Sequence, residues 1–169
     1  TPMHLAIKYG RADVAEALIG KLSKEQLNEE NFLLHMVLKN VEMQEVAGQL
    51  IEKLDEDKLV QENKLGQTPL HLAIIHGNVE VQKVAGQLIE KFPKDKLNKQ
   101  DDYGMTPLMW AIDKGQNEVA GQLIEKLPEG ELSKPAHNRG VAGGGCTPLR
   151  LATQQGQNEV AVKLINKLT

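Results

Sequence analysis

Aromatic residues, cysteine and excess charge are all scarce in this 169-residue sequence. Aromatic side chains make up 3% of the chain, and Cys146 is its one cysteine. A single cysteine excludes an internal disulfide, so we expect an intracellular, cytoplasmic protein in a reducing compartment. No apolar run approaches the roughly 20 residues of a membrane-spanning helix, which argues against a membrane protein. The formal net charge of −3 argues against nucleic acid as a partner, because binding to phosphates draws on a surplus of Lys and Arg.

Two short blocks recur along the chain. A T-P-L-H-L-A-I block is followed, after a glycine, by a V-A-G-Q-L-I-E-K block. With substitutions, the first stands at residues 1–7, 68–74, 106–112 and 147–152, and the second at residues 46–53, 84–91, 119–126 and 160–165. Self-similarity of this kind is typical of a repeat array, in which neighbouring units share one core. Hydrophobic residues make up 40% of the sequence, so such a core can form, and it must be mainly aliphatic.

Each pair of blocks predicts two helices. Thr68 is a suitable N-cap, and Pro69 is tolerated at the first helical position, where its missing N–H would have no helical partner. A glycine then ends the short first helix. In the second block Val84, Leu88 and Ile89 form an i, i+4, i+5 apolar stripe, which is typical of a helix with one buried side.

The two blocks resemble the ankyrin repeat, a unit made of a turn, a short helix opened by T-P-L-H-x-A, and a second helix. Residues 97–108 resemble the finger of that family, the turn that joins successive units. The resemblance implies an all-α ankyrin-repeat solenoid of about five helix-turn-helix units with long or irregular fingers. We expect a single array over residues 1–169, with units at residues 1–31 (partial), 32–67 (degenerate), 68–105, 106–146 and 147–169. Because the chain begins inside a repeat, we also expect it to be part of a longer protein.

Several positions depart from the repeat pattern. The second unit opens with F-L-L-H at residues 32–35 after a short lead-in, so we expect it to lack a full finger. Trp110 and Arg150 replace the second Leu and the His of the first block, so we expect the last unit to be less tightly tied. The Gly-rich stretch at residues 135–146 carries an insertion, and we expect it to be the most mobile part of the chain.

No residue pattern predicts catalysis. His4, His35 and His71 share one motif position, and the resemblance implies a structural role in which the imidazole hydrogen-bonds the backbone near the finger. Lying one repeat apart, they cannot share a metal ion at ligand distances of about 2 Å. The glycine run 143–145 lacks the G-x-x-x-x-G-K-[ST] spacing of a phosphate-binding loop, and Cys146 has no oriented base beside it. We therefore expect no enzyme, no cofactor and no metal.

A repeat array of this kind offers binding surface instead. The resemblance implies protein binding through a concave face lined by fingers and short helices. The positions that carry specificity in the family correspond here to Lys64, Leu65, Gln67, Ile75, His76, Asp102, Tyr103, Met105, Asp113 and Lys114. Four members of this set are apolar, and exposed apolar residues grouped in this way indicate a site for a protein partner. We expect a monomer that binds its partner through this face.

Two other functions remain open from the sequence. The near-identical V-A-G-Q-L-I blocks and the irregular unit lengths resemble ankyrin proteins of host-associated bacteria. On that interpretation the array is a targeting module of a larger effector or enzyme, acting in the host cytoplasm, with its catalytic part outside this chain. Asn28 and Asn98 resemble asparagines that are hydroxylated in some ankyrin repeats, so the array is alternatively a substrate of such an enzyme.

Overall fold

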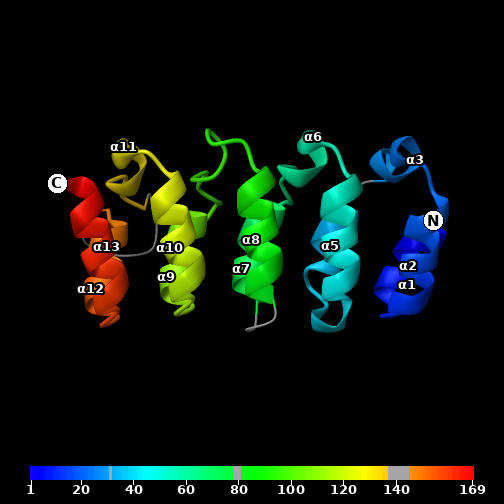
Figure 1. Cartoon of the computed structure of the whole chain (residues 1–169), viewed down its shortest axis with the longest axis horizontal. Helices are drawn as coiled ribbons and strands as arrows, with labels where there is room; N and C mark the ends of the chain where they lie inside the picture. The colour runs from blue at the N-terminus through cyan, green and yellow to red at the C-terminus, as the bar shows by residue number, and fades with distance from the viewer. Residues whose placement is uncertain (31, 78–80, 137–144) are drawn as a thin grey trace.

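The computed structural model describes residues 1–30, 32–77, 81–136 and 145–169. Within these ranges the chain forms helices and no strand, which confirms the all-α prediction. Five helix hairpins stand side by side in one row, with the two termini at opposite ends (Figure 1). The hairpins pair α1 (Pro2–Lys8) with α2 (Ala12–Lys21), α4 (Leu33–Val37) with α5 (Gln44–Lys53), α7 (Pro69–Ile75) with α8 (Val81–Lys91), α9 (Pro107–Asp113) with α10 (Asn117–Lys126), and α12 (Pro148–Gln154) with α13 (Asn158–Leu168).

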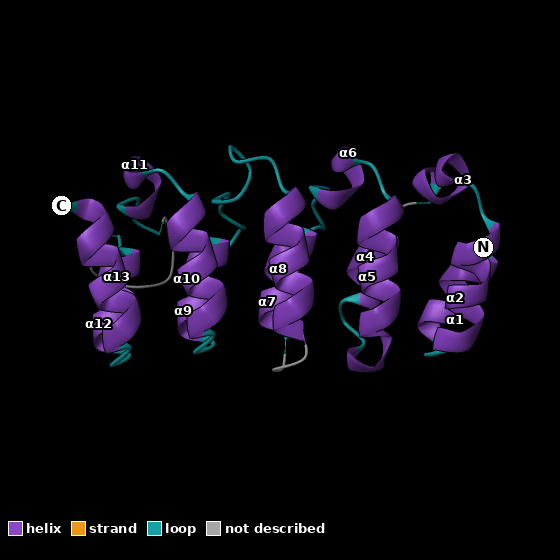
Figure 2. Cartoon of the chain, viewed as in Figure 1, coloured by secondary structure: helices purple, strands orange, loops and turns teal. Residues whose placement is uncertain are grey.

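Short helices connect the hairpins. They are α3 (Lys24–Glu29), α6 (Glu56–Leu59) and α11 (Glu129–Leu132), and a 3₁₀ turn, η1 (Val41–Met43), leads into α5. Figure 2 shows the three short helices at the same side of the row, each between the end of one hairpin and the start of the next. None of the helices in the described ranges is long and apolar enough to cross a membrane.

Local capping explains why the first helices begin where they do. The hydroxyl of Thr106 accepts a hydrogen bond from the Met109 N–H at 3.2 Å, and Thr147 caps α12 in the same way at 3.3 Å. A proline follows each of these threonines at the first helical position, where no N–H is needed. Gly115, with φ +68°, follows the end of α9 in a left-handed conformation that glycine adopts without strain.

The repeated second block supplies the centre of the core. The leucine that recurs in each copy of this block is fully buried in four hairpins, at Leu50, Leu88, Leu123 and Leu164. These side chains pack in one continuous hydrophobic cluster that runs through successive hairpins. Because each unit contacts mainly its neighbours, stability is shared between adjacent units rather than gathered in one central core.

Lysines at the ends of the second helices join consecutive hairpins. Each ammonium group donates to a backbone carbonyl near the C-terminus of the preceding second helix. The pairs are Lys53 with Ile19 (2.6 Å), Lys91 with Ile51 (3.3 Å), Lys126 with Ile89 (3.4 Å) and Lys167 with Glu125 (3.0 Å). The last carbonyls of a helix have no intrahelical partner and carry partial negative charge. The lysine near the end of each of these second helices therefore caps the preceding unit.

Glycine in the repeated V-A-G-Q block leaves room for the next unit. A Cβ placed on Gly48 would lie 3.3 Å from Oε1 of Gln87, and one on Gly86 would lie 3.3 Å from Oε1 of Gln122. These distances are shorter than ordinary van der Waals contact, so a larger residue would push the neighbouring amide aside. The glycine lowers helix propensity, and close stacking of the second helices accounts for its presence.

The second hairpin differs from the others as its sequence predicts. Residues 30–32 alone separate α3 from α4, whereas residues 60–68 separate α6 from α7, so the second unit has no room for a full finger. Phe32 stands in this shortened connection with φ 60°, the one non-glycine residue of the described ranges with positive φ. Most of the Gly-rich insertion in which we expect mobility, residues 137–144, lies outside the described residues.

Candidate protein-binding surface

Two fingers are built on the same hydrogen-bonded turn. In the first, Oδ1 of Asn63 accepts from the backbone N–H groups of Leu65 (2.8 Å) and Gln67 (3.0 Å). In the second, Oδ1 of Asp101 accepts from Tyr103 (3.0 Å) and Met105 (2.9 Å). Asn and Asp favour such turns because their short side chains reach backbone groups a few residues ahead. Each turn holds its apolar tip residue, Leu65 or Tyr103, in a defined position.

The two finger tips lie against each other. The backbone N–H of Asp102 donates to the carbonyl of Leu65 at 3.0 Å, which joins the fingers across the unit boundary. Gly66 permits this approach, because a Cβ at that position would lie 2.8 Å from Oδ1 of Asp102. The side chains of Leu65 and Tyr103 remain 43% and 49% exposed. Neighbouring tips therefore present a rigid apolar pair to solvent.

Asp101 ties the second finger to helix α9 and to the first finger. Its side chain is 5% exposed. Oδ2 accepts from the indole N–H of Trp110 at 2.9 Å and from the Gln67 amide at 3.5 Å. Trp110 departs from the repeat pattern, and this bond gives the departure a structural reason: the indole fixes the finger that carries Tyr103. The sequence showed the substitution but not its partner.

The motif histidines have the structural role that the resemblance implies at two positions. Nε2 of His35 donates to the backbone carbonyl of Gln67 at 3.2 Å and so ties the second unit to the following finger. Nδ1 of His71 accepts from the Thr68 N–H at 3.2 Å. Burial lowers the pKa of both imidazoles below the ordinary value of 6.5, so both are neutral near pH 7. His4 instead pairs with Glu30, with Nδ1 and Oε2 2.7 Å apart.

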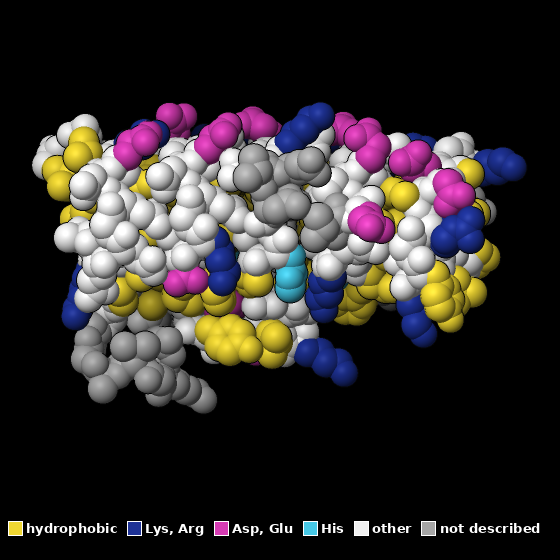
Figure 3. Space-filling model, turned by 90° about the horizontal axis from the view of Figure 1, so that it is seen from below, with side chains coloured by type: hydrophobic (Ala, Val, Ile, Leu, Met, Phe, Trp, Pro, Cys, Tyr) yellow, Lys and Arg dark blue, Asp and Glu magenta, His cyan; other side chains and the backbone are white. Residues whose placement is uncertain are grey.

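The structure places most of the predicted binding residues on one surface. We call this surface the finger face: the exposed finger tips together with the C-terminal ends of α4, α7 and α9. Exposed members of the predicted set are Lys64, Leu65, His76, Asp102, Tyr103, Asp113 and Lys114, and half-buried members are Ile75 and Met105. Figure 3 shows hydrophobic side chains projecting along the lower edge of the molecule, with Lys and Arg side chains next to them.

Gln67 does not belong to this surface. Its side chain is 6% exposed, because the amide turns inward to the base of the fingers. There its Oε1 accepts from Nδ2 of Asn63 at 3.2 Å, and its Nε2 faces Asp101. Gln67 therefore supports the fingers and offers a partner no surface, which corrects its place in the predicted set.

One residue of the finger face, Lys39, and one exposed residue of the shortened connection, Phe32, were missed by the sequence. Lys39 is exposed just beyond α4, four residues after the motif histidine, which is the position that Ile75 and Asp113 occupy in the next two hairpins. Val41 stands where those hairpins have their junction glycine, which hid the correspondence. Phe32, 42% exposed, lies where the second unit lacks its finger. The repeat register could have identified Lys39, whereas nothing in the sequence indicated the exposure of Phe32.

Positive charge gathers at the hairpin ends of the finger face. The pKa of His76 is lowered mainly by burial, and the charges of Lys39 and Lys114 lower it further. Both ammonium groups are therefore within electrostatic reach of the imidazole. Nζ of Lys114 lies 5.4 Å from the centre of the Trp110 ring and 3.5 Å from Oδ2 of Asp113. Lys39 forms no ion pair with a described residue.

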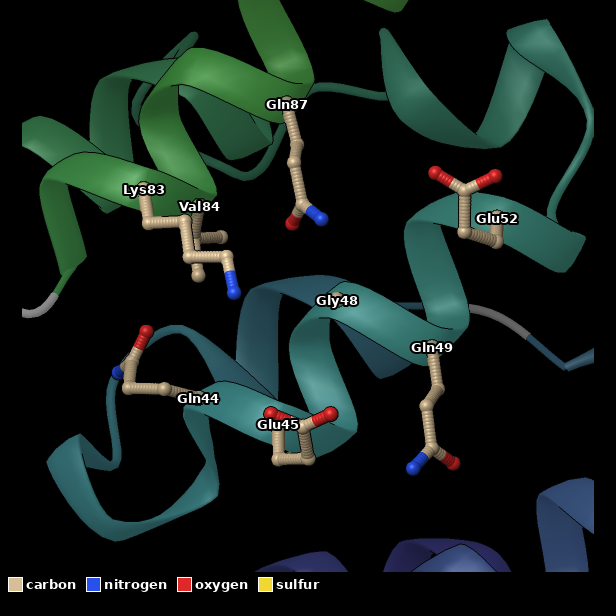
Figure 4. A pocket seen from close by; sticks show the side chains of 8 residues that line it. All are labelled: Gln44, Glu45, Gly48, Gln49, Glu52, Lys83, Val84 and Gln87. Atoms are coloured by element: carbon tan, nitrogen blue, oxygen red, sulfur yellow. The ribbon is translucent and has the colours of Figure 1, made fainter.

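A groove on the opposite side of the row is a weaker candidate. It lies between α5 and α8, holds about 360 Å³, and is lined by Gln44, Glu45, Gly48, Gln49, Glu52, Lys83, Val84 and Gln87 (Figure 4). The Gln87 amide extends toward Gly48, and Glu52 already pairs with Lys91 at 2.8 Å. The same close approach of a glutamine side chain to a glycine recurs between Gln122 and Gly86. The groove is thus a product of helix stacking rather than a distinct site.

The asparagines considered as hydroxylation sites are engaged in the fold. Asn98 is 8% exposed, and its Nδ2 donates to the Glu131 carbonyl at 2.9 Å. Asn28 donates to the Lys24 carbonyl and accepts from the Asp55 N–H, each at 2.9 Å. An enzyme would have to open the local structure to reach the Asn98 side chain. Within the described ranges, no group of three His, Cys, Asp or Glu residues is placed to hold a metal ion.

Stacked helix hairpins joined by finger turns define a helical repeat solenoid, and the fingers identify its type. The chain belongs to the ankyrin repeat family: the family model for ankyrin repeats in three copies matches residues 34–136, and the model for a single ankyrin repeat matches residues 1–29. Among curated proteins, none matches the sequence. Ankyrin repeats are generally protein–protein interaction modules and are typically not catalytic.

Proposed function

We propose that this chain is a non-catalytic scaffold, a single array over residues 1–169 that binds a protein partner through the finger face. The observation that carries the proposal is the pair of half-exposed tips, Leu65 and Tyr103, on fingers held by buried hydrogen bonds. Large apolar side chains fixed at a surface are typical anchors of protein interfaces. Because the fingers are ordered before binding, the partner does not have to offset the entropy of ordering them.

Capture of partners from a cell extract tests this proposal. The immobilised chain is compared with a Leu65→Ala/Tyr103→Ala variant, which removes both tips and leaves the finger backbone unchanged. Truncating an anchor residue costs about 2 kcal/mol or more of binding free energy, so a partner of the finger face should be lost from the variant. Circular dichroism checks that the variant keeps its helices.

A matched control uses exposed apolar residues elsewhere. Val162 and Ile165 on α13 are 53% and 47% exposed, close to the values of the two tips. A Val162→Ala/Ile165→Ala variant removes similar apolar surface from another face and should retain the partner. If both variants lose the same proteins, the capture reflects general stickiness, and the assignment to the finger face is wrong.

We also propose that the chain acts as an intracellular monomer. Cys146 is half-buried and free, which accords with a reducing environment. Sedimentation equilibrium at increasing concentration tests the monomer, and a mass that rises toward twice 18.6 kDa would contradict it.

A further inference from the structure

A row of basic side chains, two lysines and a histidine, runs across three successive hairpins of the finger face, and we call it the cationic row. Lys39 follows the C-cap of α4, His76 is the C-cap of α7, and Lys114 is the C-cap of α9. These first helices pack directly on one another in that order. Packed helices lie about 8–10 Å apart, so the row repeats a cationic or protonatable group roughly every 10 Å.

The positive charge of this row is only partly neutralised by the protein itself. Lys39 and Lys64 form no ion pair with any described residue, and Lys114 has only the adjacent Asp113. Two lysines on the second helices, by contrast, are paired: Lys91 with Glu52 and Lys126 with Glu90, each at 2.8 Å. The finger face thus keeps free positive charge on a chain whose net charge is −3.

The cationic row is connected to the apolar tips. Lys114 lies over the Trp110 ring, and the Trp110 indole donates to Asp101, which holds the turn of Tyr103. Tyr103 in turn neighbours Leu65 through the contact between the fingers. Charge at one edge and apolar surface at the other therefore belong to one rigid assembly, and a single ligand segment can contact both.

We propose that the protein partner presents an extended acidic segment whose carboxylates contact Lys39, His76 and Lys114 while an apolar side chain packs on Leu65 and Tyr103. This inference rests on the proposed function and adds the chemistry of the partner. An extended chain in the polyproline II conformation rises about 3.1 Å per residue with three residues per turn, so Asp or Glu at every third position falls on one side and roughly matches the spacing of the row. Two aspartates lie on the same face, Asp102 and Asp113. They would repel a polyphosphate backbone, because every unit of that backbone is charged, whereas a peptide can place an apolar or neutral residue opposite each aspartate.

Labelled ten-residue peptides test the proposal by fluorescence anisotropy. The first pool carries Glu at every third position with Leu or Phe in between, and the second carries Lys at the same positions. A third pool groups its glutamates at one end. We expect the first pool to bind most tightly and its affinity to fall when salt is raised, because exposed charge pairs are screened. Equal binding of the acidic and basic pools would overturn the inference.

Charge reversal locates the contact. Lys39→Glu/Lys114→Glu should weaken binding of the first pool by about tenfold, since two attractive surface pairs become repulsive. Lys83→Glu, on the opposite side of the row at the groove between α5 and α8, is the matched control and should leave the affinity unchanged. The inference fails if the control weakens binding as much as the double reversal.

The outcomes separate this inference from the proposed function. If neutral or basic apolar peptides bind and are lost only with Leu65→Ala/Tyr103→Ala, the finger face binds proteins but not through acidic residues. A short inorganic polyphosphate serves as a polyanion without apolar groups. If the polyphosphate binds as tightly as the first pool and is lost in the same charge reversal, the row recognises negative charge alone, and the acidic-segment proposal is wrong.

Discussion

Removing the Asp101 carboxylate should destabilise the array by an amount that its contacts predict. The carboxylate accepts hydrogen bonds from two backbone groups of its own finger, from the Trp110 indole at 2.9 Å and from the Gln67 amide at 3.5 Å. Hydrogen bonds to a charged acceptor contribute about 1.5–3 kcal/mol each. After truncation the two backbone N–H groups can form hydrogen bonds with water instead, and the bond from Gln67 is long. We therefore expect Asp101→Ala to cost about 2–4 kcal/mol of unfolding free energy.

Urea unfolding measures this cost with two probes. Circular dichroism reports the helices of the whole array. Trp110 is the one tryptophan of the chain, and its fluorescence reports directly on the helix that loses its bond to the finger. Because units of a repeat protein are coupled mainly to their neighbours, the fluorescence transition should shift to lower urea at least as far as the dichroism transition.

Asn63→Ala is the matched control for this prediction. Asn63 makes the same turn in the neighbouring finger, but its side chain is neutral, and its hydrogen bonds to described residues all lie within that finger. We expect it to cost about 1 kcal/mol. If Asp101→Ala costs no more than Asn63→Ala, the ties to Trp110 and Gln67 contribute nothing, and the account of a finger fixed by a buried carboxylate is refuted.

Two further predictions concern glycine and pH. Gly20→Ala should raise stability by about 0.5–1 kcal/mol in urea unfolding, because α2 gains helix propensity and no heavy atom of another described segment lies within 4 Å of the new Cβ. Gly86→Ala should gain less, since its Cβ meets Gln122 at 3.3 Å, and equal gains would contradict the stacking argument. Burial lowers the pKa of His35 and His71 below 6.5 in the folded state, so the unfolded chain binds more protons in mildly acidic solution. The contribution of these two histidines to stability is fully present above about pH 6.5 and is lost as pH falls through the folded pKa values. Urea midpoints measured between pH 8 and pH 5 should therefore decrease toward low pH. A His71→Gln variant should show a weaker dependence of the midpoint on pH.

The repeated blocks carry enough information to predict the fold. Thr caps, prolines at the first helical position and the apolar stripe of the second block all act over a few residues, so the sequence displays them directly. Leu88 and its repeat equivalents are buried as that stripe requires. The lysines that cap the preceding helix were not predicted, because the E-K ending of each block looks like an ordinary exposed pair. Their role depends on carbonyl groups 34–42 residues away along the chain.

The finger face was predictable only where exposure follows from position in the repeat. Leu65 and Tyr103 stand at turn tips, and a tip has nowhere to be buried within its own unit. Gln67 stands at the base of a finger, where the direction of its side chain depends on Asp101 in the next unit. That aspartate is buried and also accepts a hydrogen bond from Trp110. Gln67, at a position that favours binding, therefore becomes a structural support through a chain of contacts that includes Trp110, a substitution in a different repeat. The repeat consensus describes each unit alone, so it cannot predict a dependence of this kind.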